Sequence, residues 1–172
     1  MSTLGLLERW ETAHQVAVVP VGAVQFVSFQ QTRAIGTRNL NSCSVVVIVS
    51  THGAILAHIP PRPPNPSMNP YAGDENVRSM MGQVKTLYGH YKASGYFPQA
   101  ETIVIRAGFQ LEVALLDQMA IMQQSLQELG YTPSVHTYDV PVNRDVPGQG
   151  TVIVGSNGNE GRPVVYLQEN PV

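Results

Sequence analysis

The sequence predicts a single α/β domain in which helices pack on a mixed β-sheet. Three observations carry this prediction. Apolar residues make up 43% of the 172 residues and charged residues 13%, a composition that supports a packed core. The length fits one domain spanning residues 1–172. Runs of β-branched residues and stripes at helical spacing alternate in the order strands, helix, strand, helix, strands.

The first strands are expected in residues 17–30, whose β-rich composition is interrupted by a Pro-Val-Gly sequence. After this interruption the side chains alternate, which places Val24 and Phe26 on one face and Val27 on the other. The polar residues that follow, 31–42, are expected to form a loop.

A β-hairpin is expected next. Residues 44–50 form a continuous β-branched run, which is typical of a strand buried on both faces. Thr-His-Gly punctuates the sequence after it, and residues 54–59 have the composition of an antiparallel partner.

Six of the thirteen prolines lie in residues 60–76, which therefore cannot form a helix or a central strand. A stiff, proline-rich surface loop is expected there. Its P-x-x-P spacings could recruit an SH3-type partner, and the alternative is an ordered insertion packed on its own domain.

Two helices and four more strands complete the prediction. Asp74 is expected to cap a helix that ends at Gly95, and residues 111–129 form a second helix that stops at Gly130. The apolar stripes of the two helices are Met80, Met81, Val84, Leu87, Tyr88 and Tyr91, and Leu115, Met119, Met122, Leu126 and Leu129. The strands are expected within residues 101–107, 132–140, 151–155 and 163–168.

The composition argues against several classes of function. The net charge is −2 and no basic residues cluster, so no nucleic-acid partner is expected. No run of apolar residues is long enough for a membrane span. No secretory signal is evident, so a cytoplasmic location is expected, with delivery as an effector left open. The single cysteine, Cys43, and the wide spacing of the histidines predict no disulfide, no metal and no other cofactor.

The hairpin can bring Cys43 and His58 together. If a two-residue turn joins Ser50 to Gly53, His58 lies opposite Val45, and Cys43 points to the same face as His58. A three-residue loop would shift the register and separate them. An imidazole in contact with a thiol can take its proton and activate it as a nucleophile. The alternative is that Cys43 is a small buried hydrophobe.

The stretch "TRNLNSCSVVVIVSTHGAILAHIP" is similar to the signature of CheD, the family of bacterial chemoreceptor glutamine deamidases. Thr37 stands six residues before Cys43, Leu40 and Ser42 match the residues that precede the cysteine, and "AHIP" matches the end of the signature. "VVPVGAVQFVSF" and "LQELGYTPSVHTYDV" extend the resemblance loosely over residues 18–142. The Cys-His core also resembles that of deamidase toxins of the cytotoxic necrotizing factor type.

The resemblance implies a three-layer α/β/α sandwich and hydrolysis of a glutamine side-chain amide in a protein substrate, with release of ammonia. It implies Cys43 as nucleophile, His58 as general base and acid, and Thr37 as the residue that positions the histidine. Asn41 and Ser42 would shape the oxyanion loop. The sequence departs from the family in having Asn41 in place of a glycine, a shorter interval from cysteine to histidine, and the additional proline-rich loop. The resemblance therefore does not identify a chemoreceptor substrate.

Two other functions fit the same residues. A Cys-His pair could act on a small-molecule amide or another acyl group, because surrounding loops decide the substrate. The domain could also be a non-catalytic interaction module with a buried, unreactive Cys43. Comparing the activity on free glutamine with that on protein glutamine separates the first alternative from a protein deamidase. Rapid alkylation of Cys43 near neutral pH would argue against the second alternative, a non-catalytic module.

Overall fold

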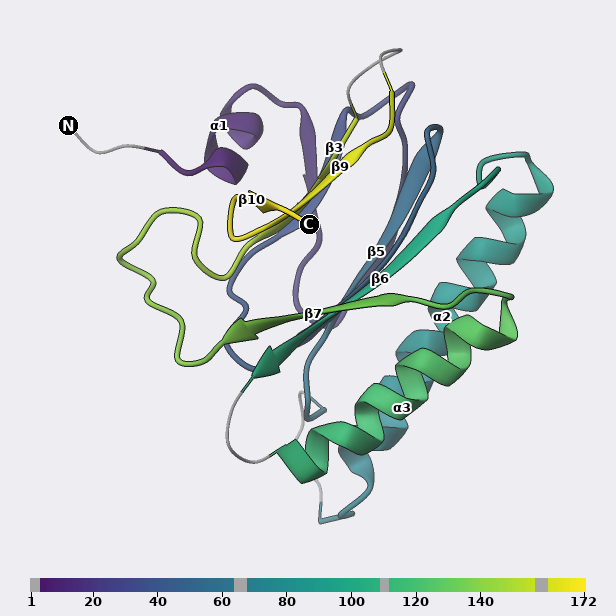
Figure 1. Cartoon of the computed structure of the whole chain (residues 1–172), viewed down its shortest axis with the longest axis vertical. Helices are drawn as coiled ribbons and strands as arrows, with labels where there is room; N and C mark the ends of the chain where they lie inside the picture. Colours follow the sequence, from purple (N-terminus) through teal and green to yellow (C-terminus); the bar gives the residue numbers. More distant parts are fainter. Residues whose placement is uncertain (1–3, 64–67, 109–111, 157–160) are drawn as a thin grey trace.

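The computed structural model describes residues 4–63, 68–108, 112–156 and 161–172, with the backbone alone for residues 112–116. It is a mixed α/β protein with two mixed five-stranded sheets and three helices (Figure 1). The helices are Leu6–Thr12 (α1), Ala72–Ala93 (α2) and Glu112–Glu128 (α3). The strands are Val16–Val18 (β1), Val24–Ser28 (β2), Ala34–Thr37 (β3), Ser44–Val49 (β4), Gly53–Ile59 (β5), Glu101–Gly108 (β6), Ser134–Asp139 (β7), Val152–Gly155 (β8), Val164–Leu167 (β9) and Asn170–Pro171 (β10).

The two sheets differ in which part of the chain builds them. The first sheet has the strand order β1-β3-β8-β9-β10, and the second has the order β2-β5-β4-β6-β7. The pairs β1–β3 and β6–β7 are parallel and the other pairs are antiparallel. Each sheet is therefore mixed, as the α/β prediction required.

The two sheets pack face to face around one hydrophobic core. Side chains of the first sheet such as Ile35 and Val154 meet side chains of the second such as Val47, Leu56 and Ile105. Helices α2 and α3 lie side by side on the outer face of the second sheet, and α1 lies on the far side of the molecule, against the first sheet (Figure 1). The layers therefore run α1, first sheet, second sheet, α2 with α3.

The expectation of one mixed sheet in a three-layer α/β/α sandwich is corrected by this arrangement. Strand patterns in the sequence identify strands but not their partners, and here the second apolar face of each central strand is covered by another sheet or by helices. Part of the error arose in residues 31–42, which were expected to be a loop. They contain β3, a short strand buried along its whole length that pairs with β1 and β8.

Most of the expected elements are confirmed. The side chains of Val24 and Phe26 pack toward the helices, and Val27 packs between the sheets, as the alternation predicted. Gly95 and Gly130 follow the two long helices with φ of 84° and 94°, the left-handed conformation that ends a helix. The predicted stripes pack in the core beneath the helices, with Leu87, Tyr91 and Leu129 only partly buried and the side chain of Leu115 outside the described part of the chain. Helix α1 was not predicted.

The boundary of the proline-rich loop is corrected. Helix α2 begins at Ala72, so the last residues of the range 60–76 are helical, and residues 64–67 lie outside the described residues. Asn69 forms the turn that precedes the helix, whose N-cap is Tyr71: its side-chain oxygen accepts a hydrogen bond from the Tyr71 amide at 2.9 Å, and its carbonyl accepts one from the Ala72 amide at 3.1 Å. Asp74 lies in the first turn, where its charge complements the helix dipole, and is not the N-cap. None of the helices among the described residues has the length and apolar character needed to cross a membrane.

Candidate active site

The hairpin β4–β5 has the register that places Cys43 and His58 on one face. Val45 pairs with His58, and the Ser50 amide donates to the Gly53 carbonyl at 2.9 Å, so the turn has two residues. Cys43 lies two residues before Val45 and therefore shares its face. Both belong to the core between the sheets, which is the side on which His58 meets the first sheet.

Thr37, at the end of β3, joins the histidine across the two sheets. Its Oγ1 lies 2.6 Å from His58 Nδ1 and 2.7 Å from the carbonyl oxygen of Val19. A carbonyl can only accept, so the single hydroxyl proton of Thr37 goes to Val19. The hydroxyl oxygen must then accept from Nδ1, which fixes the neutral His58 ring with its proton on Nδ1. The remaining lone pair of the ring is on Nε2.

The unpaired nitrogen of His58 is buried. The side chain is completely buried, and Nε2 has no hydrogen-bond partner among the residues that the structure describes. Burial disfavours the imidazolium and lowers the pKa of His58 from 6.5 to about 4. At neutral pH the ring is therefore uncharged and holds a free basic lone pair inside the protein.

Cys43 is also buried and uncharged. It is 8% exposed, and burial raises the pKa of its thiol from 9.0 to about 11. The thiol does not donate to His58 Nε2, since that atom has no partner within the described part of the chain. The structure thus joins Thr37 to His58 by a hydrogen bond and places Cys43 on the same face without such a bond.

The loop before Cys43 is tied to the segment that follows β7. Asn41 Oδ1 accepts a hydrogen bond from the Val142 amide at 2.9 Å, and the Leu40 amide donates to the Gly150 carbonyl at 3.0 Å. Gly150 has a φ of 72°, and a Cβ added there would lie 2.8 Å from the Leu40 carbonyl oxygen. Asn41 therefore shapes this loop through its bond to Val142, while Ser42 is half-buried beside the cysteine.

Sequence reasoning missed Tyr138 on β7. Its hydroxyl donates to the carbonyl oxygen of Cys43 at 2.6 Å, and its side chain is 2% exposed. Residues 132–140 were predicted as a strand, but the sequence does not show which strand lies two places from β4. A large aromatic residue in a strand of otherwise polar character was the available signal.

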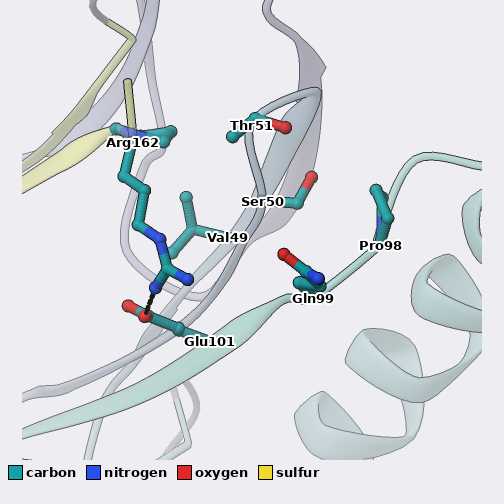
Figure 2. A pocket seen from close by; sticks show the side chains of 8 residues that line it. Val49, Ser50, Thr51, Pro98, Gln99, Glu101 and Arg162 are labelled. Atoms are coloured by element: carbon teal, nitrogen blue, oxygen red, sulfur yellow. Dashed lines mark hydrogen bonds and ion pairs between the residues drawn. The ribbon is translucent and has the colours of Figure 1, made fainter.

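Two pockets lie at the other end of β4 and β5 from Cys43. One, of about 100 Å³, is lined by Val49, Ser50 and Thr51 together with Pro98, Gln99, Glu101, Arg162 and Pro163, and Figure 2 shows the ion pair of Arg162 with Glu101 at its wall. The other, of about 230 Å³, lies beside His52 and Tyr96. Neither includes a residue of the Cys43–His58–Thr37 group. Among the described residues, no three His, Cys, Asp or Glu side chains are arranged to hold a metal ion.

No protein-family model matches this sequence, and no curated protein matches it either.

Proposed function

We propose that this protein is a cysteine-dependent amidohydrolase that converts a glutamine side chain of a protein substrate to glutamate, as CheD-type deamidases do. The observation that carries the proposal is the Thr37–His58 hydrogen bond, which leaves on the face that Cys43 shares a buried Nε2 with no partner among the described residues. A nucleophile, a base and a group that orients the base are the three parts that acyl transfer by cysteine needs.

In the first half of the reaction, Cys43 Sγ attacks the carbonyl carbon of the substrate amide while its proton passes to His58 Nε2. The carbonyl π electrons move to the oxygen, and the loop at Asn41 and Ser42 would supply the hydrogen-bond donors for this charge. The tetrahedral intermediate collapses, the C–N bond breaks, and Nε2 returns its proton to the leaving nitrogen. Ammonia departs and a thioester on Cys43 remains.

In the second half, water attacks the thioester carbonyl while Nε2 accepts one of its protons. The C–S bond then breaks, the sulfur regains a proton from the imidazolium, and the glutamate side chain is released. Throughout both halves Thr37 holds the Nδ1 proton and so keeps Nε2 available. The net reaction consumes one water and releases one ammonia.

The uncharged ground state decides when the proton moves. The pKa values of about 11 for Cys43 and about 4 for His58 disfavour a thiolate–imidazolium pair before substrate binds. Proton transfer must therefore accompany attack on the carbonyl. As the proton leaves, negative charge develops on sulfur, and the forming C–S bond moves this charge to the carbonyl oxygen.

One observation favours the non-catalytic alternative. Cys43 is 8% exposed and its thiol is protonated at neutral pH, as is usual for a structural cysteine. Against this alternative stands the Nε2 of His58, which lacks a partner in the part of the chain that the structure describes. A buried nitrogen with no partner costs stability, and a purely structural histidine normally has both ring nitrogens paired.

The test is release of ammonia from casein, from a short peptide containing glutamine, and from free glutamine. Wild type, Cys43→Ala and Thr102→Val are compared. Thr102→Val is the matched control because Thr102 is buried in the neighbouring strand β6, and its hydroxyl has no partner among the described residues.

The proposal expects wild type and Thr102→Val to release ammonia from casein, and Cys43→Ala to be slower by roughly 10³-fold or more. Release from free glutamine but not from casein would favour the small-molecule alternative. Equal rates for wild type and Cys43→Ala would refute a cysteine-dependent reaction.

A further inference from the structure

The side chains of Cys43, Ala107 and Tyr138 form a row across the second sheet. Strand β4 pairs with β6 so that Val45 lies opposite Ile105, and β6 pairs with β7 so that Ala107 lies opposite Tyr138. Extending the β4–β6 register by two residues brings Cys43 next to Ala107. Cys43, Ala107 and Tyr138 all belong to the core between the sheets, so the row lies on the face of His58.

Tyr138 reaches across β6 to the cysteine. Cys43 and Tyr138 belong to strands two places apart, roughly 10 Å across the sheet. The small side chain of Ala107 stands between them and is itself 2% exposed. The Tyr138 ring can lie over this alanine, and its hydroxyl then meets the Cys43 carbonyl oxygen at 2.6 Å.

This hydrogen bond gives the Cys43 carbonyl a donor that the β4–β6 pairing does not provide. The ladder between β4 and β6 ends at Val45 and Ile105, so the Cys43 carbonyl lies beyond the last paired residue of β4 on this side. A buried carbonyl without a donor is costly, and the Tyr138 hydroxyl provides that donor. Fixing this carbonyl fixes the peptide plane that follows Cys43, and with it the direction in which the thiol leaves the backbone.

We propose that Tyr138 is a positioning residue that orients the Cys43 thiol through this hydrogen bond. The effect on turnover rests on the proposed amidohydrolase function, whereas the effect on the thiol does not. Tyr138 touches neither a reacting atom nor His58 in any described contact, so its action passes through the Cys43 backbone.

The state of the phenol agrees with a permanent donor. Burial raises the pKa of Tyr138, and the neighbouring Cys43 group raises it further, against a smaller opposing effect of a backbone hydrogen bond at Ser42. The hydroxyl therefore keeps its proton over the whole range in which the protein would work.

The test compares Tyr138→Phe with Tyr131→Phe. Both substitutions remove one phenol hydroxyl from a hydrogen bond and keep the ring. The Tyr131 hydroxyl bonds that of Tyr88 at 2.8 Å on the helix side of the second sheet, away from Cys43. Circular dichroism and the thermal midpoint establish that both variants remain folded.

The first readout is the rate at which iodoacetamide alkylates Cys43, followed by mass spectrometry at mildly alkaline pH. Tyr138→Phe should be alkylated about fivefold faster than wild type, the population change that one hydrogen bond typically governs. Tyr131→Phe should match wild type. Equal alkylation rates in the two variants would overturn the proposal.

The second readout is ammonia release from casein. Tyr138→Phe should lower kcat by about tenfold with KM within about twofold, because the substrate contacts are unchanged and only the attack is misdirected. Faster alkylation of Tyr138→Phe together with no turnover by wild type would support the positioning role and refute the amidohydrolase. If wild type turns over, and Tyr138→Phe matches Tyr131→Phe in both alkylation rate and kcat, the amidohydrolase would be supported and the positioning role refuted.

Discussion

Replacing Thr37 with valine removes a hydroxyl that serves two buried partners and keeps the shape of the side chain. In the structure Oγ1 donates to the Val19 carbonyl and accepts from His58 Nδ1, and Thr37 and His58 are both completely buried. Valine can do neither, so one acceptor and one donor are left without partners in the core.

The expected loss of stability follows from these two groups. An unsatisfied buried polar group costs about 1–3 kcal/mol, so two such groups should lower the free energy of unfolding by roughly 2–6 kcal/mol. A domain of this size typically has an unfolding free energy of about 5–15 kcal/mol, so the loss is a large fraction of the total and is easily measured.

The same change should alter the histidine. With no acceptor at Nδ1, the His58 proton is no longer held there, and the ring can carry it on Nε2 instead. A ring protonated on Nε2 cannot accept the thiol proton. Loss of general-base function typically lowers a rate by about 10²–10⁴-fold, so ammonia release should fall by this factor.

Two measurements check this reasoning, with Thr102→Val as the control. Urea denaturation gives the stabilities, and nitrogen NMR of labelled histidine reports which ring nitrogen of His58 carries the proton. Thr102→Val should be neutral or slightly stabilising, because its hydroxyl is buried without a partner among the described residues. A wild-type His58 that carries its proton on Nε2 would refute the tautomer assignment. Equal stabilities for the two variants, with Nδ1 still protonated in Thr37→Val, would refute the role of Thr37 in holding that proton.

Three further predictions concern stability. His58 has a pKa of about 4 in the folded protein against 6.5 in the unfolded chain, so as pH falls the unfolded chain binds the extra proton first. The unfolding free energy should therefore fall by about 3 kcal/mol as pH drops from 6.5 to 4, and His58→Gln should lack this part of the pH dependence in urea titrations. Asn41→Ala removes the acceptor of the Val142 amide and should lower the unfolding free energy by about 1 kcal/mol while increasing hydrogen exchange at that amide. Gly53→Ala would put a Cβ 2.6 Å from the Val27 carbonyl oxygen, so it should destabilise the protein by about 1–3 kcal/mol in thermal unfolding, and an unchanged midpoint would contradict this close packing.

The part of the site that could be predicted is the part encoded by local spacing. Fifteen residues separate Cys43 from His58 in the sequence, and a two-residue turn is enough to place them on one face. The strand period of two then fixes the parity of every position between them. The sequence therefore predicted β4 and β5, and the shared face followed once the structure gave the turn two residues and not three.

The contacts that complete the site depend on topology instead. Thr37 could be proposed from a family resemblance, but its contact with His58 requires β3 to lie in a different sheet that packs against β5. Tyr138 is 95 residues from Cys43 in the sequence and meets it only because β7 follows β6 in parallel. No periodicity in the sequence specifies which sheets form or which strands neighbour one another.

The burial of Cys43 and His58 changes how the reactivity of the thiol should be interpreted. Rapid alkylation near neutral pH was expected to separate a catalytic cysteine from a structural one. With a pKa of about 11 and 8% exposure, slow alkylation is expected in either case, because iodoacetamide needs the thiolate and only a very small fraction of Cys43 is ionised near neutral pH. A substrate amide differs from this reagent, because the Cys43 thiol can attack its carbonyl carbon while His58 Nε2 takes the thiol proton. Ammonia release is therefore the measurement that distinguishes the two functions, and a thiol inert to alkylation is compatible with an active enzyme.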